Sequence, residues 1–260
     1  MTLKIIRRLL PEFGTTYGPP GDGPFPAILL LHGSEGGPSG WSHRLAVMFA
    51  AHGFLAYPHS YSRGGNAWNA GSIIDVPLDR TVQALDALRA FPHAGPRIGL
   101  YGVSRGAEHA LLLATLLEQH GLRSVEAIAV HSPPDVICHG FNSAAWRDKG
   151  DPGWQAHDPG HRAWTWQGSS EHLLPTTPLA VEQISAPLFI SHGTEDRVWS
   201  VEMTRRLEQR LTLGGKNAEI HYLTGQDHMV DGATENALND KLLDFFELTL
   251  TGPTRPMDQQ

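Results

Sequence analysis

Residues 97–115 read RIGLYGVSRGAEHALLLAT, and this stretch decides the fold expected for the chain. Its apolar run, residues 98–101, is typical of a buried strand. Residues 102–106, GVSRG, follow at once, and residues 107–117 contain no glycine or proline, which favours a helix. A strand, a sharp turn and a helix form the context in which G-x-S-x-G indicates a nucleophile elbow rather than an ordinary strand–helix connection.

An elbow of this kind places special demands on the residues around its serine. The turn holds Ser104 in a strained backbone conformation, and the residues two positions away must be small to avoid collision. Gly102 and Gly106 meet that demand. Ser104 Oγ is therefore expected above the carboxyl edge of a sheet, at the N-terminus of a helix whose dipole favours negative charge.

Length and composition restrict the class of protein. The 260 residues are 40% hydrophobic, which suits one α/β domain that spans residues 1–260. A net charge of −7 without long basic runs argues against nucleic acid and membrane surfaces as partners. The single cysteine, Cys138, excludes an internal disulfide, and neither a signal peptide nor an apolar span of about 18 residues is recognised, so we expect a cytoplasmic location.

Strand-like and helix-like segments alternate along most of the chain, which predicts a mostly parallel sheet with helices on both faces. The expected strands are residues 27–31, 54–57, 98–101, 125–130, 187–191 and 218–223, and the expected helices are residues 41–52, 75–91, 107–117, 201–213 and 234–250. Residues 3–10 are predicted to form an edge strand and residues 11–26 a loop. Residues 133–180 break the alternation and predict a cap insertion.

A serine is a poor nucleophile without a base, and the base needs a carboxylate to orient it. With the elbow first, the expected chain order is serine, then acid, then histidine. Asp196 directly follows a predicted strand and is the preferred acid, with Glu195 as the alternative. His228 follows the last predicted strand and is the preferred base, since His221 lies inside that strand.

An oxyanion formed in acyl transfer needs two backbone N–H donors. One is expected from Arg105, the residue after the serine. The other is expected from the glycine-rich residues 32–37, where the Ser34 N–H is the first choice and the Glu35 N–H the second. Glycines serve tight strand–helix connections equally well, and that interpretation stays open.

The insertion supplies the candidates for a substrate pocket. It contains four of the seven tryptophans, at positions 146, 154, 164 and 166. Trp164 and Trp166, together with Glu35, are the predicted pocket residues, and hydrophobic packing is the alternative role for the tryptophans. Cys138 has no elbow around it and is interpreted as a plain thiol. Glu108, one turn after the serine, is expected to pair with Arg105 or with the helix N-terminus.

These motifs resemble the α/β-hydrolase superfamily. Within it they are most similar to the C-terminal domain shared by acyl-CoA thioesterases and bile-acid-CoA:amino-acid N-acyltransferases, which is related to dienelactone-hydrolase-like enzymes. The resemblance is carried by residues 33–37, 102–108, 164–168, 174–175, 196–200 and 227–228. It implies an α/β-hydrolase fold, a Ser104, Asp196 and His228 triad, and acyl transfer to water or to an amine, without a metal or a cofactor.

Two features set this chain apart from its animal counterparts. Its length leaves no room for their additional N-terminal β-sandwich, and it has a serine where the amidating members use cysteine. In addition, the insertion has three basic residues (Arg147, Lys149, Arg162) against five acidic ones (Asp135, Asp148, Asp151, Asp158, Glu171), which disfavours a polyanion such as coenzyme A.

The sequence therefore predicts a serine hydrolase that cleaves small apolar carboxylic esters through an acyl-enzyme. The alternatives are an acyl-CoA thioesterase or an acyltransferase. A hydrolase fold used only for binding is the non-enzyme alternative. In each case the expected partner is a small-molecule ester or thioester, and the oligomeric state is left open.

Overall fold

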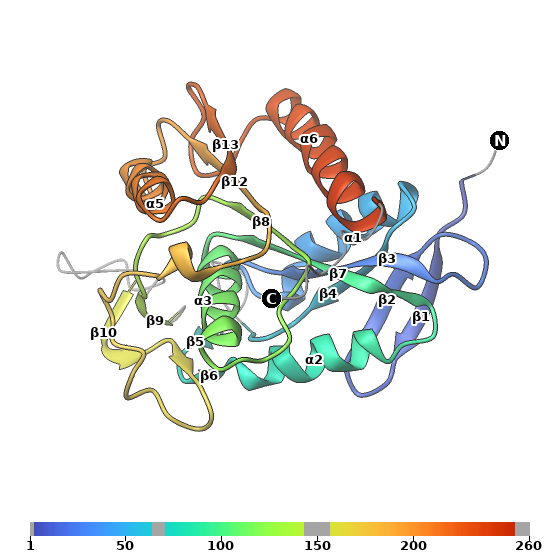
Figure 1. The fold of residues 1–260 in the computed structure, drawn as a ribbon, viewed down its shortest axis with the longest axis horizontal. Coiled ribbons are helices and arrows are strands. Elements are labelled where there is room, and N and C mark those ends of the chain that lie inside the picture. The colour runs from blue at the N-terminus through green and yellow to red at the C-terminus, as the bar shows by residue number, and fades with distance from the viewer. Residues whose placement is uncertain (1–2, 64–70, 143–156, 253–260) are drawn as a thin grey trace.

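An eight-stranded sheet forms the centre of the protein in the computed structural model, which describes residues 3–63, 71–142 and 157–252 (Figure 1). The strands lie in the order β1 (Ile6–Leu10), β2 (Gly14–Gly18), β4 (Leu55–His59), β3 (Phe25–Leu31), β7 (Ala94–Val103), β8 (Ala127–His131), β12 (Leu188–Gly193) and β13 (Ala218–Leu223). In this order the six strands from β4 to β13 are parallel to one another. β2 runs antiparallel to both of its neighbours, β1 and β4. The mostly parallel sheet predicted from the sequence is therefore present.

Helices cover both faces of this sheet, so its central strands consist of apolar residues on both sides. Residues of β3 show the alternation: Ile28 and Leu30 pack with α1 (Trp41–Ala51) and α6 (Gly232–Thr251), and Leu29 packs with the opposite layer. That layer contains α2 (Asp79–Arg89), α3 (Arg105–Gln119) and α5 (Glu202–Leu213). Figure 1 shows α1 and α6 together, on the other side of the strands from α2 and α3.

The described part of the insertion packs beside α3. β9 (His139–Asn142) joins β5 (Ser72–Ile73) and β10 (His157–Arg162) in a small three-stranded sheet. β11 (Trp164–Thr165) pairs with β6 (Val76–Pro77). A one-turn helix, η2 (Val181–Gln183), leads back to β12, and a second one, η1 (Gly37–Ser39), precedes α1. Trp146, Trp154 and the charges at residues 147–151 lie outside the described residues.

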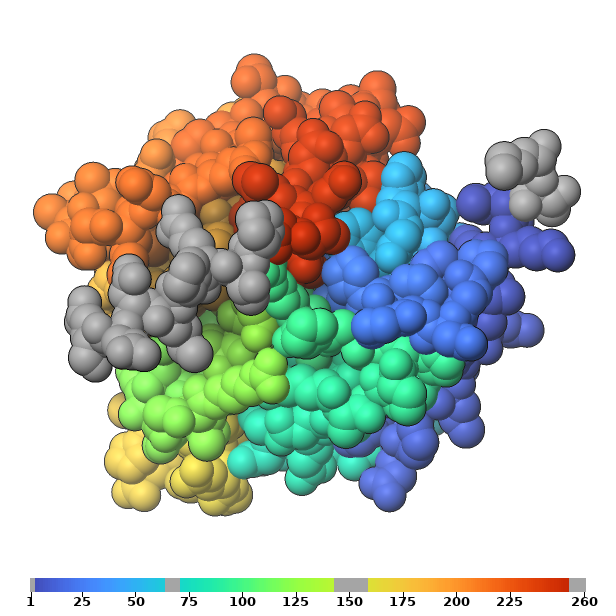
Figure 2. Space-filling model, turned by 45° about the vertical axis from the view of Figure 1, so that its right-hand side comes forward, coloured from blue at the N-terminus to red at the C-terminus, as the bar shows by residue number. Residues whose placement is uncertain are grey.

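Segments far apart in the sequence meet around the central strands. In the space-filling view the last third of the chain, orange to red, lies above the green and teal segments that carry α2 and α3, and the first third, blue, lies to one side (Figure 2). This arrangement follows from the sheet order, in which β3 and β7 occupy the middle and the chain ends add the outer strands.

Two boundary predictions were wrong. Residues 11–26 were expected to be a loop, yet Gly14–Gly18 form β2, because Thr15, Thr16 and Tyr17 suit an extended strand and pair with β1. The helix expected over 75–91 begins only at Asp79, since Val76–Pro77 are held in the pairing with β11. In both cases a short segment with a weak local signal forms a strand because it pairs with another strand.

Direct packing of α6 on β7 can be tested at Gly99. A Cβ at this position would lie 2.6 Å from Cε1 of Phe246, which is fully buried. We expect Gly99→Ala to lower the free energy of unfolding by about 1–3 kcal/mol, as overpacking does. Urea denaturation measures the change. The control is Gly232→Ala at the start of α6, where a Cβ meets nothing within 4 Å and stability should be unchanged or slightly raised. Equal stabilities of the two variants would contradict this packing.

Candidate active site

Ser104 has the backbone geometry of an elbow. It lies between β7 and α3 with φ 55° and ψ −117°, a region that residues other than glycine rarely occupy. The flanking glycines are needed for space: a Cβ at Gly102 would lie 2.1 Å from the Gly106 carbonyl oxygen, and one at Gly106 would lie 2.3 Å from that of Leu31. The serine side chain therefore lies at the carboxyl edge of the sheet, where the substitution of either glycine would force β7, α3 and β3 apart.

Asp196 and His228 lie at the same edge of the sheet, after β12 and β13. Nδ1 of His228 lies 2.8 Å from Oδ2 of Asp196. Because a carboxylate only accepts hydrogen bonds, Nδ1 carries the proton, and Nε2 of the neutral ring keeps a lone pair. The other carboxylate oxygen, Oδ1, accepts the N–H groups of Val198 and Trp199, each at 2.8 Å.

The carboxylate of Asp196 is held in its ionised form. Burial alone would raise the pKa of Asp196, but hydrogen bonds from His192 and His228 outweigh it and hold that pKa well below its usual range. Nε2 of His192 lies 3.1 Å from Oδ2 of Asp196 and 2.8 Å from the carbonyl oxygen of Trp199. Since both neighbours accept, His192 Nε2 is the donor, and the acid is fully occupied by donors from three directions.

The loops that carry the acid and the histidine are fastened together by Asp227. Its Oδ1 accepts the N–H of Arg197 at 3.0 Å and the N–H of His228 at 2.7 Å, and its Oδ2 pairs with the Arg197 guanidinium. These bonds hold the pKa of Asp227 at about 2. Asp227 thus bonds the backbone on either side of the Asp196–His228 pair and does not contact the imidazole ring. The sequence indicated no such role for Asp227.

The two alternatives weighed for these positions have other surroundings. Glu195 is exposed on the loop, and its backbone N–H donates to the carbonyl of Gln226 at 2.9 Å. His221 points away into a pair with Glu219 on the same strand, at 2.7 Å. Among the described residues, Nδ1 of His228 forms its hydrogen bond with Asp196 and with neither alternative.

A buried histidine links the elbow to the His228 loop. The N–H of Ser104 bonds the carbonyl of His131, the last residue of β8, at 2.9 Å. Nε2 of His131 in turn donates to the carbonyl oxygen of His228 at 3.3 Å, and Nδ1 contacts Oγ of Ser191 at 2.9 Å. Burial lowers the pKa of His131 to about 4, so it stays neutral at physiological pH. Since β8 lies between β7 and β12, His131 connects the nucleophile and base loops across the sheet edge.

The predicted oxyanion donors lie on opposite sides of Ser104. Arg105 begins α3, so its N–H has no acceptor within the helix. On the other side, the Gly33 N–H bonds Oε1 of Glu35 at 2.9 Å, and the Glu35 N–H also faces that carboxylate. Among the described residues no acceptor is found for the Ser34 N–H. The arrangement therefore favours Ser34 over Glu35 as the second donor.

The Glu35 carboxyl, predicted from the sequence to border the substrate, lies near Ser104. A Cβ at Gly33 would lie 2.5 Å from Oε2 of Glu35 and 3.4 Å from Cβ of Ser104. Burial raises the pKa of Glu35, while its hydrogen bonds and the nearby His228 act in the opposite direction. The Glu35 carboxyl therefore takes up a proton more easily than an exposed one and places a polar group close to Ser104.

The family model described as "BAAT / Acyl-CoA thioester hydrolase C terminal" matches residues 81–231. This range holds Ser104, Asp196 and His228 and is more than half of the chain. The chain belongs to this family. The resemblance predicted from the motifs is thereby confirmed.

Curated relatives carry thioesterase and acyltransferase names. Mouse acyl-coenzyme A thioesterase 6 is 28% identical over 235 residues, which cover 84% of this chain and 51% of the relative. Rat acyl-coenzyme A amino acid N-acyltransferase 2 is 35% identical over 125 residues, or 48% of this chain and 28% of the relative. The chain thus spans at most about half the length of these relatives.

Solved structures share the fold at low sequence identity. A putative dienelactone hydrolase from Klebsiella pneumoniae superposes with a TM-score of 0.63 at 16% identity, covering 95% of this chain and 99% of the other. Thermogutta terrifontis esterase 2, solved in a form phosphonylated by sarin, gives a TM-score of 0.62 at 17% identity, covering 96% and 97%. These similarities establish the α/β-hydrolase fold of this family member.

A buried ion pair ties the elbow helix of this family member to the insertion. Nη1 of Arg105 lies 2.9 Å from Oε2 of Glu108, with both side chains almost completely buried. Oε1 of Glu108 accepts the Cys138 N–H and the Trp164 indole N–H, each at 2.7 Å. Arg105 also donates to the carbonyl of His139 at 2.8 Å. The pairing of Glu108 with Arg105 was expected, whereas its insertion partners were not.

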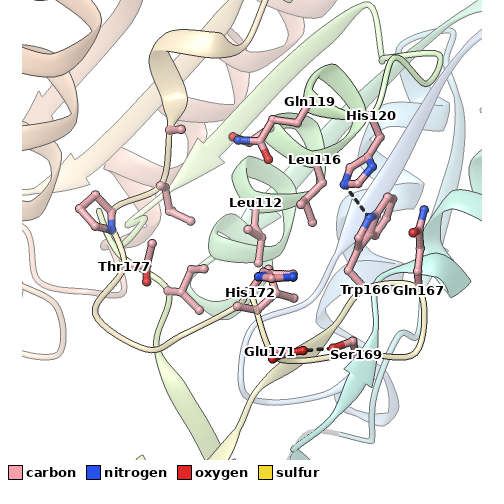
Figure 3. A pocket seen from close by; sticks show the side chains of 16 residues that line it. Leu112, Leu116, Gln119, His120, Trp166, Gln167, Ser169, Glu171, His172 and Thr177 are labelled. Atoms are coloured by element: carbon pink, nitrogen blue, oxygen red, sulfur yellow. Dashed lines mark hydrogen bonds between the residues drawn. The ribbon is translucent and has the colours of Figure 1, made fainter.

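Both tryptophans assigned to a substrate pocket lie elsewhere. Trp164 is fully buried, so it does not line an open pocket. Its indole N–H donates to the Glu108 carboxylate, and its ring packs against the Arg105 guanidinium. Trp166 lines a cavity at the far end of α3 (Figure 3). Trp164 thus packs in the interior of the fold. Cys138 is a free cysteine, and burial together with Glu108 raises the pKa of its thiol, in keeping with an inert role.

The described ranges 3–63, 71–142 and 157–252 lack two kinds of feature. No helix there is long and apolar enough to cross a membrane. No group of three or more histidine, cysteine, aspartate or glutamate side chains there is arranged to hold a metal ion.

The ion pair makes a prediction for stability. Glu108→Ala leaves the Arg105 charge buried without its partner, so we expect a loss of about 3–5 kcal/mol in the free energy of unfolding, measured by urea denaturation. The control is Glu202→Ala, which breaks an exposed pair of the same i, i+3 spacing and should cost less than about 1 kcal/mol. Combining Arg105→Met with Glu108→Leu should recover part of the loss. Equal losses of stability in Glu108→Ala and Glu202→Ala would contradict this account.

Proposed function

We propose that this protein hydrolyses acyl esters or thioesters through a covalent acyl-enzyme on Ser104, with His228 as base and Asp196 as its orienting acid. The observation that carries the proposal is the 2.8 Å bond from His228 Nδ1 to an ionised, buried Asp196 at the sheet edge where the strained Ser104 lies. That bond leaves Nε2 as the proton acceptor that a serine nucleophile requires.

The reaction proceeds in two acyl-transfer steps. Ser104 Oγ attacks the acyl carbonyl carbon while His228 takes the hydroxyl proton, and the Ser34 and Arg105 N–H groups stabilise the oxyanion. The tetrahedral intermediate collapses, the bond to the leaving oxygen or sulfur breaks, and His228 returns the proton to the alcohol or thiol. Water, deprotonated by His228, then attacks the acyl-serine. The bond between the acyl carbon and Oγ breaks, His228 returns the proton to Ser104 Oγ, and the carboxylic acid is released.

We further propose that residues 1–260 form one domain and that residues 133–180 form a cap beside the elbow. The bonds from Glu108 and Arg105 to Cys138 and His139 support it, because they bring the start of the insertion next to Ser104. A cap at this place would border the acyl group while the sheet edge supplies the reactive residues.

A small carboxylic ester is the preferred substrate. Coenzyme A carries several phosphate charges, and Arg105, which is a candidate to meet them from the elbow, is buried and committed to Glu108 and His139. The second candidate is an acyl-CoA thioester, favoured by membership of a family with thioesterase relatives. Transfer of the acyl group to an amine is the further possibility that the acyltransferase relative suggests.

The triad assignment predicts large and selective losses of activity. Ser104→Ala, Asp196→Ala and His228→Ala should each lower kcat for p-nitrophenyl ester hydrolysis by about 10⁴, with double variants little worse than single ones. Glu195→Ala, next to the acid but without contact to His228, should change kcat less than about threefold. A fluorophosphonate should label Ser104 alone. An unlabelled protein would favour the binding-only alternative, and unaffected hydrolysis by Ser104→Ala would exclude the mechanism.

The substrate assignment predicts a preference between two leaving groups. At equal acyl length, kcat/KM should be higher for an ethyl or phenyl ester than for the acyl-CoA after allowance for leaving-group reactivity. The acyl-CoA reaction should show little dependence on salt, since few phosphate contacts are available. A more efficient acyl-CoA reaction that weakens steeply with salt would instead establish the thioesterase, and product analysis with added amines would reveal acyl transfer.

A further inference from the structure

A cavity of about 640 Å³ lies between the C-terminal half of α3 and the last part of the insertion (Figure 3). Its volume is within the range of about 300–1,000 Å³ that small-molecule sites occupy. The cavity is open to solvent on one side, because His120, His172 and Thr177 in its lining are exposed.

This cavity is separate from the candidate active site. Ser104, Asp196, His228 and both oxyanion donors are absent from its lining. Its first α3 residue, Leu112, lies eight positions after Ser104 and its last, Gln119, lies fifteen, which at 1.5 Å per residue is roughly 12 to 22 Å along the helix axis. A substrate bound at the elbow therefore does not fill it.

The inner wall of the cavity is apolar. Leu112 and Leu116 project from successive turns of α3, and Ile137, Leu173 and Leu179 face them from the insertion. All five side chains are buried. A hydrocarbon group placed here would gain about 25 cal/mol for each Å² of apolar surface removed from water.

The mouth of the cavity is polar and contains two histidines. The indole N–H of Trp166 donates to Nε2 of His120 at 3.0 Å, and Figure 3 shows the two rings side by side. Because indole only donates, Nε2 carries no proton, and Nδ1–H of His120 is the donor that remains. His172 is exposed at the same mouth and its ring also lies over the cavity in Figure 3. No lysine or arginine is among the described residues that line the cavity.

We propose that this cavity is a second, non-catalytic binding site for a medium-chain aliphatic carboxylic acid. The chain lies against the leucines of α3 and the insertion, and the carboxylate accepts hydrogen bonds from His120 Nδ1–H and from His172. The lining offers two neutral histidine donors, enough for a single carboxylate, but no lysine or arginine to offset the several charges of a phosphate-bearing ligand such as coenzyme A, which is therefore disfavoured. Glu171 lies at the rim, where solvent screens its charge, and so lowers affinity only modestly.

The site assignment does not depend on the proposed hydrolysis, although the ligand belongs to the chemical class that hydrolysis would release. Binding is therefore tested by calorimetry with decanoate, without any measurement of activity. Two variants fill the cavity: Thr177→Trp from the exposed rim and Leu116→Trp from α3. The matched control is Leu213→Trp, which places the same side chain at an exposed position on α5.

We expect one decanoate per chain, with Kd raised at least about tenfold by each filling variant and unchanged by Leu213→Trp. If Leu116→Trp fails to fold, Thr177→Trp decides, because Thr177 is exposed and its replacement does not disturb the buried core. Equal Kd in the filling variants and the control would overturn the proposal. So would the lack of saturable binding up to about 1 mM, the weak limit for a specific small ligand.

The headgroup is tested separately. His120→Phe keeps a ring against Trp166 and removes the Nδ1–H donor. It should weaken decanoate at least about threefold and leave decanol unchanged, since an uncharged hydroxyl depends less on that donor. Decanol that binds more tightly than decanoate, or an equal loss for both ligands, would overturn the assignment of a carboxylic acid.

Discussion

Close backbone contact at the elbow is the constraint on which the rest of the site depends. The carbonyl of Leu31, at the end of β3, lies so near Gly106 that no Cβ fits between them, and the same holds for Gly102 and the Gly106 carbonyl. Ser104 is left with a positive φ, a conformation that costs about 1–3 kcal/mol and is retained only when its surroundings enforce it. Here β3, β7 and α3 enforce it together.

The buried Arg105–Glu108 pair makes that strained turn part of a larger unit. A buried ion pair contributes little net stability, because desolvation cancels most of its attraction, but removal of one partner is costly. In this protein each charge has further partners in the insertion, at Cys138, His139 and Trp164. These contacts link the first turn of α3 to the insertion. The side chain of Arg105 thereby holds its own backbone N–H in place.

Close backbone contacts and hydrogen bonds also join the loops after β12 and β13. Gly193 lies against the carbonyl oxygens of Gln226 and Asp227 without room for a Cβ, and Asp227 bonds the backbone N–H groups of Arg197 and His228. The Asp196–His228 bond is thus supported on both sides by backbone contacts. His131 adds a bond from β8, so that three neighbouring strands hold the histidine loop.

The sequence by itself determined the elements whose signals are local. The apolar runs of β3, β7 and β12, the glycines around Ser104 and the order of Ser104, Asp196 and His228 were sufficient for the fold class and for the candidate triad, because periodicity and turn chemistry involve neighbours in the chain. Tertiary structure alone decided β2, the roles of Asp227 and His131, the burial of Trp164 and the cavity lined by Trp166. Apart from the short β1–β2 pairing, each of these depends on contacts between residues tens of positions apart, which composition and spacing do not encode.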